Sequence, residues 1–438
     1  MNFKDTEIGR IPFEWDVRMI QDVAEVVSGA TPKTKVAEYW DGNIAWITPK
    51  DLSNHTERYI YRGDRMITDE GLKNSSAKLL PKGSVLFSSR APIGYTAIAA
   101  QELCTNQGFK SMICNQQILD NNFMFYMMNY KKNEIENIAG GSTFKEVSGK
   151  TVKEFKIPIP PLDEQKAIAK VLSDLDEKIE INNKINKKLE EMAQAIFKQW
   201  FVDFEFPNED GKPYKSSGGE MVESELGMIP KGWEVILLDE IVDTFNGYSY
   251  KGKELSESED AMITIKNFDR NGGYKMDGLK EIVISDKVKP HHFVEVNDII
   301  VAHTDLTQGA EIIGNPIMIF SKGSYEKLIM SMDTVKVKSK IKEMNNELLY
   351  FILKDYRFKQ YALGYVNGTT VLHLSKSTIP QYKIALPYDK SIMNQLGDNL
   401  SPIMSKIANN FKENEKLIML RDALLPKLMS GEIRVPMD

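Results

Sequence analysis

The chain has 438 residues, of which 42% are hydrophobic and 27% charged, and its formal net charge is −6 at pH 7. These values are typical of folded globular proteins and exclude a chain that is disordered throughout. The net charge does not indicate a nucleic-acid-binding protein, although a locally basic surface can still bind phosphates. Two cysteines cannot build a disulfide framework, and no stretch is long and apolar enough to span a membrane. We therefore expect a cytoplasmic protein.

The sequence contains an internal repeat, because its second half resembles its first. Residues 8–17 (IGRIPFEWDV) match residues 226–235 (LGMIPKGWEV), and residues 47–52 (ITPKDL) match residues 263–268 (ITIKNF). Each copy then reaches a strand-like run, FKIPIP or YKIALP, before a long helical pattern begins. A repeat of this kind predicts two copies of one domain, each followed by a helix.

In the first copy, short alternating runs such as residues 83–90 predict strands among turns, and residues 120–138 predict one helix. A long amphipathic helix is expected from about residue 163 to 205, because apolar residues recur at helical spacing and Pro160 and Pro161 precede it. A polar stretch rich in Gly, Pro and Ser then predicts a linker.

In the second copy, residues 297–303 predict a strand and residues 346–363 predict one helix. The second long helix is expected to break at Ser401-Pro402, which has the composition of an N-cap followed by a first-turn proline, and to kink at Pro426. Pro402 leaves open whether the two long helices are equally long.

Two asparagines occupy equivalent places in the apolar stripes of the two long helices: Asn182 and Asn186 correspond to Asn410 and Asn414. We interpret them as polar layers that fix the register of one helix against the other at some cost in stability. Alternatively, each asparagine lies at the edge of an amphipathic face. The residues predicted to lie in the helix interface are Leu172, Leu175, Ile179, Asn182, Asn186, Leu189, Ile407, Asn410, Asn414 and Leu417.

These elements predict an α+β protein with two tandem domains and two long antiparallel helices that form a coiled-coil spacer. A protein with two similar domains has approximate twofold symmetry and suits a partner with the same symmetry. Duplex DNA is the obvious candidate for such a partner. A helix of about 40 residues spans roughly 60 Å, whereas half-sites one DNA turn apart are separated by about 34 Å. The spacer could therefore hold two domains over two short DNA segments.

Specific motifs then resemble a known family. Residues 158–205 closely resemble the central conserved region of the specificity (S) subunit of type I restriction-modification systems, and residues 420–435 (LRDALLPKLMSGEIRV) resemble its distal conserved region. The segments IPFEWDV and IPKGWEV are similar to the starts of the family's target-recognition domains. The domains expected on this basis are residues 1–157 and 225–387 as target-recognition domains, 158–206 and 388–438 as helical spacers, and 207–224 as a linker.

The resemblance implies a non-catalytic subunit that recognises a bipartite double-stranded DNA site, with one half-site for each target-recognition domain. The paired helices would set the gap between half-sites and dock two adenine-methyltransferase (M) subunits. Restriction/translocase (R) subunits would join that complex, so that S-adenosylmethionine, ATP and magnesium are expected on the partner subunits.

The sequence lacks several catalytic motifs, which agrees with a subunit that has no activity of its own. The sequence has no GxxxxGKS/T phosphate-binding loop and no NPPY-like methyltransferase motif. Residues 164–166 have the ExK spacing of a nuclease core, but their place in the first turn of a helix favours a structural role. The histidines form no metal-binding cluster, so we expect no metal and no cofactor on this chain. Two alternatives stay open: a coiled-coil scaffold that binds only proteins, and an independent enzyme.

Base contacts need donors and acceptors on loops or helix ends. Corresponding segments of the two copies supply them, and two Gly-containing turns followed by hydroxyl residues could hold a phosphate. The unlike sequences SSR (88–90) and HTD (303–305) predict two different half-sites. The candidate DNA-binding residues of the first domain are Thr31, Lys33, Lys50, Ser88, Ser89, Arg90, Asn106, Gln107, Lys110, Gly141, Ser142 and Thr143. Those of the second domain are Tyr248, Ser249, Lys251, Lys266, Asn267, His303, Thr304, Gln308, Gly368, Thr369 and Thr370.

Overall fold

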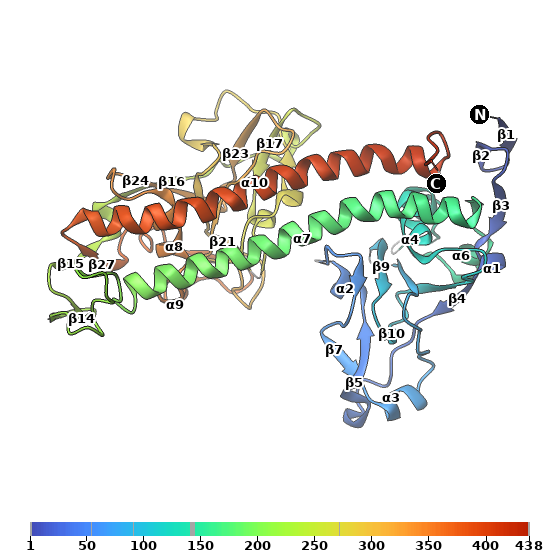
Figure 1. Cartoon of the computed structure of the whole chain (residues 1–438), viewed down its shortest axis with the longest axis horizontal. Coiled ribbons are helices and arrows are strands. Elements are labelled where there is room, and N and C mark those ends of the chain that lie inside the picture. Colours follow the sequence, from blue (N-terminus) through green and yellow to red (C-terminus); the bar gives the residue numbers. More distant parts are fainter. Residues whose placement is uncertain (1, 54, 91, 141–144, 271, 437–438) are drawn as a thin grey trace. The chain divides into compact units, whose positions relative to one another are not determined.

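The computed structural model describes residues 2–53, 55–90, 92–140, 145–270 and 272–436. The chain forms two compact units: Met1–Ile181 with Lys416–Asp438, called unit 1, and Asn182–Glu415, called unit 2. Each unit contains an α+β domain and part of both long helices, α7 (Leu162–Phe201) and α10 (Lys390–Met429) (Figure 1). The prediction of a tandem α+β architecture with two long helices is therefore confirmed.

Unit 1 contains a five-stranded sheet, in the order β4-β11-β8-β9-β6, and a three-stranded sheet, in the order β10-β5-β7. Strand β8 is a continuous buried run, VLFSS, which suits its central place in the larger sheet. Strand β12 pairs with β3 and so joins the end of the domain to its start. The strands are β1 (Phe3–Thr6), β2 (Gly9–Pro12), β3 (Asp16–Met19), β4 (Ala24–Ser28), β5 (Trp40–Ile47), β6 (Tyr59–Ile60), β7 (Arg65–Ile67), β8 (Val85–Ser89), β9 (Ile93–Ala99), β10 (Leu103–Thr105), β11 (Lys110–Cys114) and β12 (Lys156–Ile159).

The helix predicted over residues 120–138 is two helices, α4 and α5. Lys131 leaves the helical conformation (φ −87°, ψ 2°) and caps both, while its buried side chain pairs with Glu134 at 2.6 Å. The prediction of one helix was wrong at this residue because the apolar pattern continues across the turn. The helices of the domain are α1 (Ile20–Val23), α2 (Pro49–Leu52), α3 (Asp69–Lys73), α4 (Asn121–Tyr130), α5 (Lys132–Asn137) and α6 (Gly149–Glu154), with a 3₁₀ helix at Ala37–Tyr39.

Unit 2 repeats this topology. The sheet β16-β24-β20-β22 has the same antiparallel order as β4-β11-β8-β9, and the parallel pair β17 and β23 repeats β5 and β10. Strand β27 pairs with β15 as β12 pairs with β3. The strands are β13 (Met221–Ser224), β14 (Gly227–Pro230), β15 (Trp233–Leu237), β16 (Val242–Asn246), β17 (Asp260–Ile263), β18 (Lys280–Glu281), β19 (Phe293–Val294), β20 (Ile299–Ala302), β21 (Thr304–Asp305), β22 (Pro316–Met318), β23 (Lys327–Met330), β24 (Thr334–Ser339), β25 (Val366–Asn367), β26 (Leu372–Leu374) and β27 (Lys383–Pro387).

The helix predicted over residues 346–363 is also two helices, α8 (Asn346–Lys354) and α9 (Tyr356–Leu363). The prediction failed at Asp355, whose extended backbone ends α8 and whose carboxylate accepts the backbone N–H of Arg357 at 2.9 Å, which caps α9. The 3₁₀ helices of unit 2 are Leu238–Glu240, Gly252–Glu254, Ile265–Asn267, Met276–Gly278 and Pro290–His292.

The two long helices are equally long, with 40 residues each. The predicted break at Ser401-Pro402 was wrong, because α10 continues through Pro402 and also through Pro426. Pro402 is exposed, whereas Leu400 and Met404 beside it are buried. Packing of these apolar residues outweighs the cost of an internal proline, about 3 kcal/mol. Helix α7 ends at Phe201, earlier than expected.

Within unit 2, the asparagines of α7 hydrogen-bond to those of α10. Asn182 Nδ2 donates to Asn414 Oδ1 at 2.8 Å, and Asn410 Nδ2 donates to Asn186 Oδ1 at 2.8 Å. As the residue number rises along α7 from 182 to 186, the number of its partner in α10 falls from 414 to 410. The helices are therefore antiparallel, as predicted. Of the other residues predicted for the interface, Leu172 and Ile407 are buried, and the half-buried ones are Leu175, Ile179, Leu189 and Leu417.

Buried polar contacts join the helices to their domains. In unit 1, Asp176 of α7 accepts the Tyr126 hydroxyl at 2.5 Å and the Arg421 guanidinium at 2.8 Å. In unit 2, Glu190 of α7 accepts hydrogen bonds from Tyr350 and Lys354 of α8. Each domain is thus fixed to its own part of the helix pair.

Candidate nucleic-acid interface

In unit 1, four strands end at one edge of the domain. Ser28, the last residue of β4, pairs with Lys110, and Ile47, the last residue of β5, pairs with Thr105 at the end of β10. The backbone N–H of Ser89, at the end of β8, donates to Gly108 O at 2.7 Å. The loops that follow these strands therefore lie together, and we call this surface the strand-end edge of unit 1.

Exposed or half-exposed polar side chains of this edge come from separate loops. Thr31 hydrogen-bonds to Gln107 across two of them, and Lys33 is exposed. Lys50 is also exposed and pairs with Asp64 at 3.2 Å. Asn106 is half-buried, and its Oδ1 accepts the backbone N–H of Gly108 at 2.8 Å. The structure thus places these predicted residues on loops of one edge, and their contact with DNA stays a prediction.

Two cations of this edge share one carboxylate. Arg90 Nη1 lies 3.6 Å from Glu146 Oε2, and Lys110 Nζ lies 4.0 Å from Glu146 Oε1. Burial lowers the pKa of Lys110, which the charge of Glu146 partly offsets. The Arg90 side chain is 37% exposed and can meet an anion, whereas that of Lys110 is only 10% exposed.

Two residues predicted to contact bases support the edge instead. Ser88 and Ser89 are fully buried. The Ser88 hydroxyl donates to Pro92 O and accepts the N–H of Tyr95, both at 2.8 Å, and the Ser89 hydroxyl donates to Gly108 O. Hydroxyls buried and bonded in this way have little left to offer a base, so this part of the prediction is corrected. Gly141, Ser142 and Thr143 lie outside the described residues.

Unit 2 has an equivalent strand-end edge. Asn246 at the end of β16 pairs with Val335, and Ala302 at the end of β20 pairs with Thr334. Ile263, the last residue of β17, pairs in parallel with Met330 of β23. Four loops therefore meet here too.

Sequence reasoning missed one loop of this edge, residues 331–333. The N–H of His303 donates to Asp333 O at 2.8 Å, and the N–H of Met332 donates to Tyr248 O at 2.9 Å. The missed loop is the counterpart of residues 105–110 in the repeat, so the repeat itself held the signal that could have identified it.

Several predicted contacts of this edge are buried and bonded within the protein, which corrects their assignment as direct base readers. Asn267 accepts the N–H of Thr264 at 2.9 Å and donates to Lys275 O at 2.8 Å. The Tyr248 hydroxyl bonds Glu254 and Ser285, both at 2.9 Å, and Thr304 Oγ1 lies 3.3 Å from His373 Nδ1. Burial also lowers the pKa of His303 to about 4. The exposed candidates are Ser249, Lys251, Lys266, Gln308, Gly368, Thr369 and Thr370.

The loop that carries Gln308 is firmly held. Asp305 accepts the backbone N–H groups of Thr307 and Ile312, each at 2.8 Å. Lys359 donates to three carbonyls of the same loop, at 2.6 to 3.3 Å, and burial lowers its pKa to about 8. Gln308 itself donates to Thr369 O, which joins two of the exposed candidate segments. The loop is therefore preorganised for a contact.

Gly368 supports the predicted phosphate-binding turn. Its φ of +111° suits only glycine, and a Cβ there would lie 2.1 Å from Val371 O. Thr369 and Thr370 follow it and are exposed. A turn of this kind can present backbone amides to an anion.

The described part of the chain shows no group of three or more His, Cys, Asp or Glu residues that could hold a metal ion. Among the same residues, no helix combines the length and apolar character that a membrane crossing requires.

Comparison with known proteins accounts for the duplicated fold. Residues 12–191 and 230–418 each match the model of the family described as the type I restriction modification DNA specificity domain. The chain belongs to this family. It is 38% identical to the MjaIX type I restriction enzyme specificity subunit of Methanocaldococcus jannaschii, over 99% of this chain and 96% of that protein. The resemblance inferred from the sequence motifs is thereby confirmed.

More distant relatives agree. The chain is 25% identical to the HindI type I restriction enzyme specificity subunit of Haemophilus influenzae, over 89% of this chain and 94% of that protein. The crystal structure of the S subunit from M. genitalium matches with a TM-score of 0.51 at 17% identity, covering 94% of this chain and 96% of that one. The last match supports the fold.

Proposed function

We propose that this chain is the DNA sequence-specificity subunit of a type I restriction-modification complex and has no catalytic activity of its own. The observation that carries the proposal is the presence of two copies of a DNA specificity domain, each with a strand-end edge on which polar and basic side chains gather. A protein that reads DNA needs side chains of this kind at loop ends.

Each domain would read one half of a bipartite site. On the edge of unit 1, the exposed or half-exposed candidates include Arg90, Asn106 and Gln107, which suit guanine and adenine edges. On the edge of unit 2, Lys266 and Gln308 offer a different arrangement. Because the readers differ, the half-sites differ. The turn at residues 368–370 would contact a phosphate and so set the position of the protein on the duplex.

The domain limits proposed for this function are residues 1–157 and 225–387 as target-recognition domains, with helical regions 158–206 and 388–438. The helices α7 and α10 both run through the two units, and we expect their length to set the number of unread base pairs between the half-sites. Methyltransferase (M) and restriction (R) subunits would bind this chain and supply S-adenosylmethionine, ATP and magnesium.

The alternative, a scaffold that binds only proteins, explains the paired helices but gives no role to the two strand-end edges. The discriminating experiment is methylome sequencing of a host with and without this chain. A bipartite N6-methyladenine motif that disappears when the chain is deleted supports the proposal. An unchanged methylome, together with no preference of the purified methyltransferase complex for any DNA sequence, contradicts it.

A further inference from the structure

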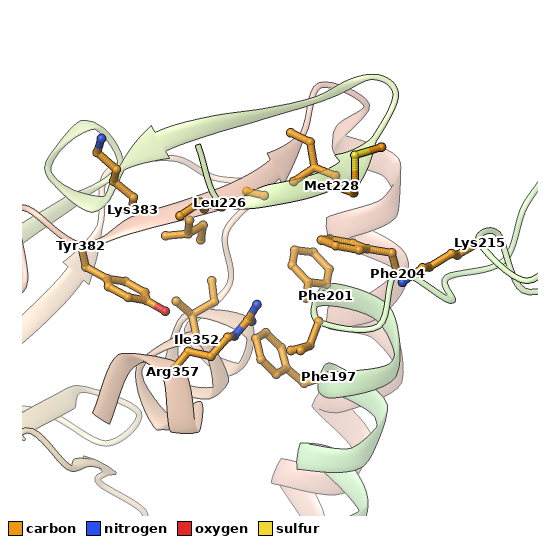
Figure 2. A pocket seen from close by; sticks show the side chains of 14 residues that line it. Phe197, Phe201, Phe204, Lys215, Leu226, Met228, Ile352, Arg357, Tyr382 and Lys383 are labelled. Atoms are coloured by element: carbon orange, nitrogen blue, oxygen red, sulfur yellow. The ribbon is translucent and has the colours of Figure 1, made fainter. Parts of the chain in front are cut away.

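Unit 2 contains a cavity of about 510 Å³ that the DNA-reading proposal does not use. Its wall is formed by the end of α7, the hairpin strand β14, strand β27 and the helices α8 and α9 (Figure 2). Phe197, Phe201 and Ile352 supply aromatic and aliphatic surface. The volume lies within the range of about 300 to 1,000 Å³ that is usual for ligand sites.

The charged side chains that line the cavity are all basic. Lys215, Arg357 and Lys383 line it, and no aspartate or glutamate is found among the described residues that do. Figure 2 shows the Tyr382 hydroxyl and the Arg357 guanidinium directed into the same space. Arg357 Nε donates to Asp355 at 2.7 Å, which holds the guanidinium in place, and Lys383 pairs with Glu225. Each of these carboxylates offsets part of its partner's charge, so Lys215 is the lining cation for which the described residues show no ion pair. An apolar cavity with cations at its rim is complementary to an apolar group flanked by negative charge.

A comparison of the two copies shows that unit 1 has a carboxylate that unit 2 lacks next to this cavity. In unit 1, Trp15 Nε1 donates to Glu164 Oε2 at 3.0 Å, and this buried carboxylate also accepts two hydrogen bonds from Arg434. An indole N–H and a guanidinium thus share one carboxylate. The residues concerned lie where the end of α10 meets the first domain.

Trp233 is the counterpart of Trp15 in unit 2. Its ring lies 5.1 Å from Phe201 and 5.3 Å from Phe204, which line the cavity. Its Nε1 is buried and has no hydrogen-bond acceptor among the described residues. The start of α10 reads KSIM where the start of α7 reads LDEQ, so unit 2 lacks an acid in the place of Glu164. A buried donor without an acceptor costs about 1–3 kcal/mol.

Backbone strain occurs at the same site. Phe204 has a φ of +60°, which costs a non-glycine residue roughly 1 kcal/mol or more. Two apolar side chains of the neighbouring hairpin, Leu226 and Met228, are 47% and 54% exposed although they line the cavity. Strain and exposed apolar surface are both typical of a site that is completed by a partner.

We propose that this cavity binds a segment of a partner protein in which an aromatic or aliphatic anchor is flanked by carboxylates. The anchor would fill the space between Phe197, Phe201 and Met228, and the carboxylates would pair with Arg357 and Lys215. A protein segment fits better than a small metabolite because the exposed hairpin residues extend the apolar surface beyond the cavity. The proposal does not depend on DNA binding.

The test uses the full-length chain and a short fluorescein-labelled peptide in which phenylalanine and leucine are flanked by aspartates, with binding followed by fluorescence anisotropy. Replacing the aspartates by lysines should weaken binding about tenfold or more. Arg357→Gln and Met228→Asp should do the same. Met228 is exposed, so its replacement leaves the fold intact. Lys231→Glu is the matched control, because Lys231 is exposed, pairs with Glu220 and does not line the cavity.

Equal binding of the acidic and basic peptides would overturn the proposal, as would unchanged binding by both cavity variants. If 4-phenylbutyrate bound as tightly as the peptide and displaced it, the site would belong to a small carboxylate and the proposed protein segment would be wrong. Methylome results bear only on the proposed function, so the two proposals fail separately.

Discussion

The Asn186–Asn410 layer allows a quantitative test of how polar residues hold the paired helices of unit 2. Asn410 Nδ2 donates to Asn186 Oδ1 at 2.8 Å, but Asn186 Nδ2 is buried without a partner among the described residues. Replacing both residues with leucine removes one hydrogen bond, worth about 1 kcal/mol, and one unsatisfied donor, which costs about 1–3 kcal/mol. The leucines also bury additional apolar surface, worth about 1 kcal/mol or more. We expect the free energy of unfolding of unit 2 to rise by about 1–3 kcal/mol.

Asn182 provides the contrasting variant. Its Nδ2 donates to Asn414 Oδ1 at 2.8 Å and to Glu413 Oε2 at 2.9 Å. Replacing Asn182 alone with leucine leaves both acceptors without this donor, so the free energy of unfolding should fall by about 1–3 kcal/mol. The two variants replace the same residue type by the same residue type, so a general effect of leucine cannot explain opposite signs.

Hydrogen exchange measured by mass spectrometry in urea is the suitable assay, because it reports each unit separately and a single two-state value need not apply to the whole chain. Peptides from the domain of unit 1 serve as the internal control. The reasoning would be refuted if Asn186→Leu/Asn410→Leu lowered the stability of unit 2, or if Asn182→Leu raised it.

Three further predictions concern the ion pair, the buried histidine and the DNA contact. Arg434→Ala should destabilise unit 1 by about 3–5 kcal/mol, because it leaves Glu164 buried without its cation. Arg434→Ala combined with Glu164→Met should recover only part of this loss in urea unfolding, because Trp15 Nε1 then lacks its acceptor. His303 has a folded pKa of about 4 and an unfolded value near 6.5, so the unfolded chain binds the proton more tightly. Stability of unit 2 should therefore fall by up to about 3 kcal/mol as the pH drops from 6.5 to 4, and His303→Gln should flatten this part of the stability profile. Arg90→Ala should weaken binding to the recognised site by about 1–3 kcal/mol and relax one half-site in the methylome; an equal loss on unrelated DNA would make Arg90 a phosphate contact.

Local patterns in the sequence were sufficient for the architecture. Helical spacing predicted both long helices, and repeated motifs predicted two copies of one domain, because periodicity and repetition are properties of neighbouring residues. The same patterns could not locate Lys131 and Asp355, where one apolar stripe continues across two helices. They also overestimated the effect of Pro402 on α10. Its neighbours Leu400 and Met404 keep the helix intact through their burial, which depends on the tertiary structure.

The candidate DNA interface was predictable as a set of loops and not as individual contacts. Arg90, Gln107 and Gln308 each have a partner within the protein and still expose part of their side chain at the strand-end edges. Ser88 and Asn267 are buried, and their polar atoms bond within the protein. Both groups consist of polar residues at the ends of predicted strands or in the loops that follow, so the sequence alone does not distinguish them. Only the packing of loops that are distant in sequence decides which polar side chain stays exposed.

By itself, the sequence determined the duplication, the two long helices and the membership of the family, because each rests on short motifs and regular spacing. The tertiary structure alone decided the pairing of Asn182 with Asn414 and of Asn186 with Asn410. It also decided that Trp15 finds the carboxylate of Glu164 while Trp233 finds none. Both outcomes depend on side chains brought together from far apart in the chain, where burial makes each unmatched polar atom costly.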